Sequence, residues 1–246
     1  MNDFLEMHWG YSIWERVREK LNGEIDQDLL AQIDAILKHI NILAAPLATC
    51  LSTDGDVLSQ WRAYSQDGTG YAVGFRAEDL AQLQSRPLRV LYSEVEQLSE
   101  LERWVRAIAS VESNAEDKFS ADFFEACYTL AIDLASFKNP AFREEQEVRL
   151  LHTLNYLDSN NSRKLVSVGG SAFGEPCGPS KLNFLMKQGT PCAYVDINFS
   201  RDGNINPIVE VIVGPKNSAL LTGISVFLET LGHPNVVVRK SQASYR

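Results

Sequence analysis

Residues 58–75 read LSQWRAYSQDGTGYAVGF, which predicts a short amphipathic helical turn, a glycine-rich turn and then a strand. The helical turn carries Trp61, Arg62 and Tyr64 directly before the turn glycines. This crowding of aromatic and basic side chains favours a functional site. Arg62 supports that interpretation, because a guanidinium suits the capture of a carboxylate or phosphate. The alternative is that Trp61 and Tyr64 are one face of a helix packed on the core.

Hydrophobic periodicity in the rest of the chain predicts an α+β fold. Helical spacing of apolar residues covers residues 9–21, 26–43, 115–138 and 220–231. Strand patterns cover residues 48–52, 70–75, 89–92, 145–151, 164–168, 193–199, 208–213 and 236–239, with surface loops expected at 158–164 and 169–180. Helices concentrate in the N-terminal half, so we predict one domain over residues 1–246 with a mostly antiparallel sheet core.

Composition excludes several classes of protein. The 246 residues carry a net charge of −9, which disfavours strong general binding to nucleic acid. No apolar run approaches the roughly 18 residues of a membrane span, and no signal peptide opens the chain, so we expect no membrane partner. The cysteines are scattered and are not paired with histidines at metal-ligand spacing. We therefore expect a cytoplasmic location and no metal site.

The segment from Glu145 to Leu151 alternates like a strand, which would place Glu145, Glu147 and Arg149 on one face. Paired carboxylates raise each other's pKa and suit a general base or the stabilisation of an oxocarbenium ion. The alternative is a solvated face on which Arg149 and a base from a neighbouring strand neutralise both glutamates.

A second candidate for anion binding is Gly214-Pro215-Lys216-Asn217, where a predicted strand runs into a predicted helix. Backbone N–H groups and a lysine at such a junction can hold an anion. The segment lacks the glycine spacing of a phosphate-binding P-loop, so it is a weak nucleotide motif.

Four segments in this order resemble the bacterial DUF2971 family of unknown function. They are residues 59–75, residues 137–150 with the sequence FKNPAFREEQEVRL, residues 213–216 with VGPK, and residues 241–246 with SQASYR. The opening MNDFLE is similar to that family's Asn-Asp-Pro-x-Glu segment, with Phe4 in the proline's place. The resemblance covers nearly the whole chain.

A looser similarity concerns ADP-ribosyltransferases, in which a strand with Glu-x-Glu follows an NAD-holding strand. That similarity implies an ADP-ribosyltransferase-like fold, NAD as cofactor and an unknown acceptor macromolecule. Glu147 would be the catalytic carboxylate, with Glu145 two residues before it. The other residues it implies around NAD are Ser52, Trp61, Arg62, Tyr64, Arg149 and Lys216. A carboxylate near the ribose would stabilise the charge that develops as nicotinamide leaves.

The sequence departs from this pattern in two ways. It starts at the Asn-Asp segment, so the family's first strand, which would hold NAD, is expected to be missing: either the start is too late or the copy is inactive. Phe184-Leu185 also stands where the family often has Phe-Arg. Three functions are therefore weighed: an ADP-ribosyltransferase of a toxin or phage-defence system, an inactive module binding a nucleotide or protein, and a metal-dependent nuclease using Glu147, Glu210 and Lys216.

Overall fold

The computed structural model describes residues 4–172, 175–199 and 206–245 and has the predicted α+β fold. The start of the opening motif, residues 1–3, two residues of the expected 169–180 loop, and Arg246 lie outside the described residues. The helices are α1 (Phe4–Leu21), α2 (Gln27–Leu43), α3 (Leu58–Tyr64), α4 (Ala77–Leu80), α5 (Glu94–Ser113), α6 (Ala121–Asp133) and α7 (Leu221–Thr230), with 3₁₀ helices η1 (Leu134–Ser136) and η2 (Pro140–Glu145).

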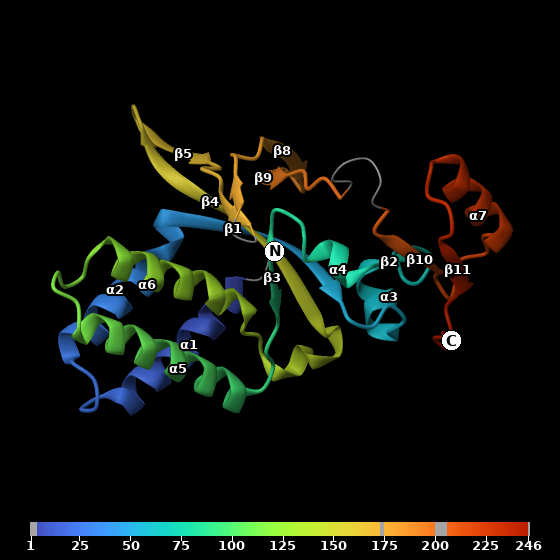
Figure 1. Cartoon of the computed structure of the whole chain (residues 1–246). Helices are drawn as coiled ribbons and strands as arrows, with labels where there is room; N and C mark the ends of the chain where they lie inside the picture. The colour runs from blue at the N-terminus through green and yellow to red at the C-terminus, as the bar shows by residue number, and fades with distance from the viewer. Residues whose placement is uncertain (1–3, 173–174, 200–205, 246) are drawn as a thin grey trace.

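Helices α1, α2, α5 and α6 form a bundle on one side of the long strands β1 and β4 (Figure 1). Their apolar stripes meet in one core, whose largest fully buried side chains include Trp14, Ile13, Leu30, Ile33, Leu101 and Leu130. Burial of such side chains is worth about 1.5–3 kcal/mol each. The N-cap predicted for the second helix is confirmed, because the Asp26 side chain accepts the N–H of Asp28 at 2.7 Å.

One carboxylate, Asp34 on α2, is buried in this bundle. It accepts hydrogen bonds from Tyr11 Oη (2.7 Å), Trp14 Nε1 (2.9 Å) and Lys38 Nζ (2.8 Å), and Arg18 Nη1 lies 2.9 Å away. Burial by itself would raise the pKa of Asp34, but the hydrogen bonds from Lys38, Tyr11 and Trp14 outweigh it and lower the pKa to about 2. Asp34 thus joins α1 to α2.

The strands form two larger sheets and two hairpins. Their bounds are β1 (Ala44–Ser52), β2 (Tyr71–Phe75), β3 (Arg86–Arg89), β4 (Glu147–Ser159), β5 (Ser162–Val166), β6 (Gly170–Ala172), β7 (Glu175–Cys177), β8 (Leu182–Lys187), β9 (Thr190–Val195), β10 (Ile208–Val213) and β11 (Val237–Lys240). One sheet has the order β1-β4-β3 with β5 also on β4, and the other has the order β11-β10-β2. Between the strands named here, in the described part of the chain, the pairs are antiparallel except β10 with β11.

Strand β4 connects the bundle with the site described below. Its inner residues Leu150, Leu151 and Leu154 are buried, whereas its first residue, Glu147, is the register partner of Ser52 at the end of β1. The second sheet, α3 and α7 lie toward the other end of the molecule, where the chain also ends (Figure 1).

The glycine-rich turn of residues 68–70 fits closely against the end of β10. Gly214 donates its N–H to Gly70 O at 3.0 Å, and Lys216 donates its N–H to Gly68 O at 2.9 Å. A Cβ on Gly214 would lie 2.5 Å from Gly68 O, so only glycine fits there. The two glycine motifs singled out in the sequence, the 68–70 turn and the segment that begins at Gly214, therefore contact each other in the fold.

Most expected elements are present with shifted ends, and several expectations were wrong. The predicted helix 115–138 is only α6, because Phe119 adopts a positive φ of 54° before it and 3₁₀ geometry follows it. The predicted strand 89–92 lies at 86–89, and β1 begins four residues earlier than expected. The expected 158–164 loop is the β4–β5 hairpin, and the 169–180 loop includes β6 and β7.

Several elements were not predicted from the sequence, among them α4, α5, η2 and β8. Helix α5 begins after the N-cap Ser93, whose side chain accepts the N–H of Glu96, and buries Leu101, Val105 and Ile108 at helical spacing. Strand β8 was also missed, because its residues are mostly exposed and do not alternate between buried and exposed positions.

Candidate functional site

A cavity of 470 Å³ lies between the end of β1, helix α3 and the β2–β10 sheet. Three of the residues predicted for the site, Ser52, Trp61 and Tyr64, are among those that line it. The whole of β2 contributes to the wall, together with Glu210 and Ile212 of β10 and the 53–55 loop. Among the residues that the structure describes, its charged lining residues are Asp54 and Glu210, and no basic side chain lines it.

Tyr64 connects the cavity with the predicted pair of carboxylates. Its side chain is 71% exposed and its hydroxyl donates to Glu145 Oε1 at 3.3 Å. Burial of the phenol, then the charge of Glu145, raises the pKa of Tyr64. The hydroxyl therefore remains protonated near neutral pH and acts as a hydrogen-bond donor.

The two glutamates belong to a buried cluster with two bases. Lys138 Nζ donates to Glu145 Oε2 and lies 3.3 Å from Glu147 Oε2. Arg149 donates to Glu147 Oε2 from Nε at 3.1 Å and from Nη2 at 2.6 Å. The Arg149 side chain is 1% exposed and that of Lys138 is 6% exposed. The two negative charges of the glutamates are therefore balanced by the two positive charges of Lys138 and Arg149, and buried charges are costly unless they are paired in this way.

The predicted geometry of the pair was wrong, although the two carboxylates do meet at Lys138. We expected both on one strand face, but Glu145 ends η2 and β4 begins only at Glu147. Gln146 between them adopts a left-handed conformation, with φ of 45°. This residue breaks the strand alternation and redirects the chain. Of the two alternatives, neutralisation is confirmed in part: Arg149 pairs with Glu147, but the second base, Lys138, lies outside the strands, and the cluster is buried rather than solvated.

Trp61 is a buried residue rather than an open stacking surface. It is 2% exposed, and its indole N–H donates to Asp56 Oδ1 at 2.8 Å. Asp56 also accepts the Ser241 hydroxyl, the Gln242 N–H at 2.7 Å and Arg239 Nη1 at 3.2 Å. Burial opposes ionisation of Asp56, but these hydrogen bonds prevail and lower its pKa. Asp56 thereby holds the C-terminal segment against α3.

Arg62 and Lys216 do not line the cavity, and each contacts the C-terminal segment instead. Both cations lie over the Tyr245 ring, with Arg62 Cζ at 5.2 Å and Lys216 Nζ at 4.2 Å from its centroid. Lys216 Nζ is also 2.6 Å from Asp67 Oδ2, and the Tyr245 hydroxyl donates to Asp67. The partners named here for Arg62 and Lys216 therefore lie in the C-terminal segment and next to the glycine-rich turn, and Glu210 pairs with Arg239 at 2.7 Å.

Cys50 is the one cysteine among the residues that line the cavity. Burial first, and then the negative charge of Glu147, raises the pKa of its thiol. A thiol with a raised pKa is a poor nucleophile, because the thiolate is the reactive form. Nowhere in the described part of the chain do three or more His, Cys, Asp or Glu side chains gather in a way that could hold a metal ion.

Three residues that matter at the site were not singled out from the sequence. Lys138 lies within the FKNP segment, so its place in a family motif was an available signal. Tyr92 accepts the backbone N–H of Glu147 at 3.0 Å, and Asp56 organises the C-terminal segment. Nothing in local spacing identifies these two, because their partners are distant in sequence.

The fold and the site define an α+β protein with a cavity beside a compensated cluster of buried charges. The model of the family described as "Protein of unknown function (DUF2971)" matches residues 60–150, which confirms the resemblance over that part of the chain. The match includes Trp61, Tyr64 and the whole charge cluster. No significant match was found among curated proteins or among solved structures.

In residues 4–172, 175–199 and 206–245, no helix combines the length and apolar character of a membrane span.

Proposed function

We propose that the protein is an NAD-dependent ADP-ribosyltransferase-like domain of a bacterial toxin or defence system, acting in the cytoplasm. The observation that carries the proposal is the link from the cavity through the Tyr64 hydroxyl to Glu145. Glu147 adjoins the same wall, as the register partner of Ser52. Tyr64 thus connects the cavity with Glu145, and Lys138 in turn contacts both Glu145 and Glu147, although neither carboxylate is among the described residues that line the cavity.

The lining suits only one half of NAD. Carboxylates and the aromatic side chains of Tyr64, Tyr71 and Phe75 favour a cationic ring such as oxidised nicotinamide with its ribose. The pyrophosphate would have to remain outside, because none of the described residues that line the cavity is basic. When bound, NAD would supply a nicotinamide–ribose bond whose cleavage leaves positive charge on the ribose.

The residues of this chain have separate tasks in that proposal. Glu145 and Glu147 provide negative charge near the reacting ribose, which lowers the energy of a cationic transition state. Lys138 and Arg149 hold the two carboxylates in place, and Tyr64 fixes Glu145 from the cavity side. Arg149 has this positioning role instead of direct contact with the cofactor.

The test is release of nicotinamide from NAD, measured by chromatography, together with mass spectrometry of proteins and nucleic acids for added ADP-ribose. We expect Glu147→Gln to abolish both signals and Glu144→Gln, an exposed neighbour, to retain them. Tyr64→Phe removes only a hydroxyl and should lower the rate without unfolding the protein. Absence of both signals from the unaltered protein would overturn the enzymatic proposal.

A second candidate is an inactive module of the same fold that binds a nucleotide or a protein. The ion pairs of Glu147 with Arg149 and Lys138 favour it, because a carboxylate held by two bases stabilises a new cation less strongly. Calorimetric binding of NAD without turnover would support this candidate. Binding lost in Tyr64→Phe but kept in Glu144→Gln would assign it to the same cavity.

A further inference from the structure

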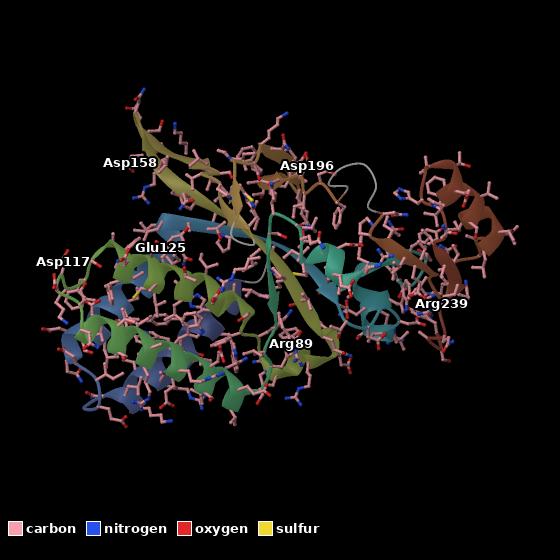
Figure 2. All side chains as sticks on the ribbon, viewed as in Figure 1. Arg89, Asp117, Glu125, Asp158, Asp196 and Arg239 are labelled. Carbon is pink, nitrogen blue, oxygen red and sulfur yellow. The ribbon has the colours of Figure 1, made fainter. Side chains whose placement is uncertain are left out.

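A second cavity, of 340 Å³, lies on another part of the molecule and shares no lining residue with the first. Its walls come from the 82–84 segment before β3, from His152 of β4, and from the chain entering β8 and leaving β9. Asp196 follows β9 and is labelled beside that hairpin in Figure 2. Small-molecule sites span about 300–1,000 Å³, so this volume suits a ligand much smaller than a dinucleotide.

The cavity presents one acid and one base that do not pair with each other. Among the described residues, Lys181 forms no ion pair, and Asp196 accepts only the Asn183 side-chain amide, at Oδ2 and 3.1 Å. Side-chain amides of Gln82 and Gln84 add donors and acceptors, and Leu83 and Ile197 add apolar surface. A ligand with only a negative charge would be attracted by Lys181 but repelled by Asp196. A ligand with only a positive charge would be attracted by Asp196 but repelled by Lys181.

His152 completes one wall in a fixed position. Its Nε2 lies 3.3 Å from Ser167 Oγ, and that oxygen accepts the N–H of Ser180 at 3.0 Å. Ser180 itself lines the cavity beside Lys181. The segment that carries Lys181 is therefore tied to the sheet through Ser167, so the base is presented from an anchored backbone.

From this arrangement we propose that the second cavity binds a zwitterionic small molecule of the α-amino acid class. The ligand carboxylate pairs with Lys181 and its ammonium group pairs with Asp196. Both charges of the lining are then compensated at once, and the amide groups and apolar side chains meet the ligand's side chain. This binding is independent of the NAD proposal, since it uses other residues and no chemical step.

Isothermal titration calorimetry with each of the twenty standard L-amino acids tests the proposal. We expect at least one to bind, and its N-acetyl and carboxamide analogues, which each lack one charge, to bind at least about tenfold more weakly. Lys181→Met and Asp196→Asn should each weaken binding by a similar factor. Lys187→Met, which changes an exposed lysine at the far end of β8, is the matched control and should have no effect.

Three results would overturn the proposal: no binding by any of the twenty amino acids, equal weakening by Lys187→Met, or undiminished binding of the N-acetyl analogue. Thermal unfolding of each variant confirms that the protein is folded, which is expected because Lys181 and Asp196 are exposed. The double exchange of Lys181→Asp with Asp196→Lys should restore part of the affinity lost in either single exchange.

Discussion

The helical bundle and the β11-β10-β2 sheet with α7 differ in how they are held together. The bundle surrounds a continuous apolar core, whereas α7 buries only Leu228 and leaves Val226 and Phe227 more than half exposed. The sheet end has a smaller apolar part, formed by Trp61 and by Val211, Ile212 and Val213 of β10, and it adds polar contacts around Asp56 and Asp67. The comparison shows that apolar burial makes one part of this fold stable, while hydrogen bonds to a few carboxylates position the parts that enclose the cavity.

The largest effect should come from the bundle core. Ile33 is fully buried, so Ile33→Ala should lower the free energy of unfolding by about 3 kcal/mol through lost burial and a residual void. Val226→Ala on α7 is the control, since Val226 is 66% exposed, and it should change stability by less than about 0.5 kcal/mol. Urea unfolding measures both, and equal losses would show that α7 is covered in solution.

At the sheet end, Asp56→Ala should cost about 2 kcal/mol, because it leaves the Trp61 indole N–H and Arg239 without this acceptor. It should also release the C-terminal segment, which limited proteolysis followed by mass spectrometry detects as faster trimming. Asp158→Ala, at the exposed tip of the β4–β5 hairpin (Figure 2), is the comparison. Unchanged trimming in Asp56→Ala would mean that other contacts hold the segment.

Because of Asp34, we expect the stability of the helical bundle to fall at acid pH. Its pKa of about 2 in the folded protein is below the ordinary value of 3.8, so its contribution is fully present above pH 3.8. It is lost as the pH falls toward 2, and it amounts to at most about 2 kcal/mol. Unfolding measured at several pH values should show a steeper acid loss for the unaltered protein than for Asp34→Asn. Parallel pH profiles would contradict this assignment.

The smallest effect is expected for Lys216, whose side chain is 42% exposed beside Asp67. Lys216→Met should cost less than about 1 kcal/mol, as exposed ion pairs usually do. The same variant should leave binding in the first cavity unchanged, because Lys216 does not line it. A change in ligand affinity, measured by calorimetry, would mean that Lys216 does contribute to ligand binding in the first cavity.

The sequence predicted elements whose signals are local, and it failed where distant contacts decide. The second helix, β10 and α7 follow from apolar periodicity with caps or breakers, and the structure confirms them. Helix α6 is shorter than its apolar stripe, because tertiary packing accommodates the same residues in 3₁₀ geometry.

The candidate site was predicted in part, for a similar reason. Tyr64 and Ser52 line one cavity, and Tyr64 contacts Glu145, but neither Glu145 nor Glu147 is among the described residues that line it. The pairing of Arg149 with Glu147, only two residues away, was one of the predicted alternatives. Arg62 and Lys216 were predicted from residue type, but both stack on Tyr245 near the end of the chain, and Lys216 pairs with Asp67, 149 residues away. A local sequence pattern cannot identify partners that lie so far away in the chain.

The left-handed turn at Gln146 has a consequence for how this segment tolerates sequence change. Only a few residue types adopt a positive φ at low cost, chiefly glycine, asparagine and aspartate. A saturation library at position 146 should therefore retain those residues and lose valine and isoleucine. The backbone makes position 146 selective even though its side chain is exposed, in addition to the hydrogen bond that Gln146 Oε1 accepts from the Thr53 hydroxyl at 3.0 Å.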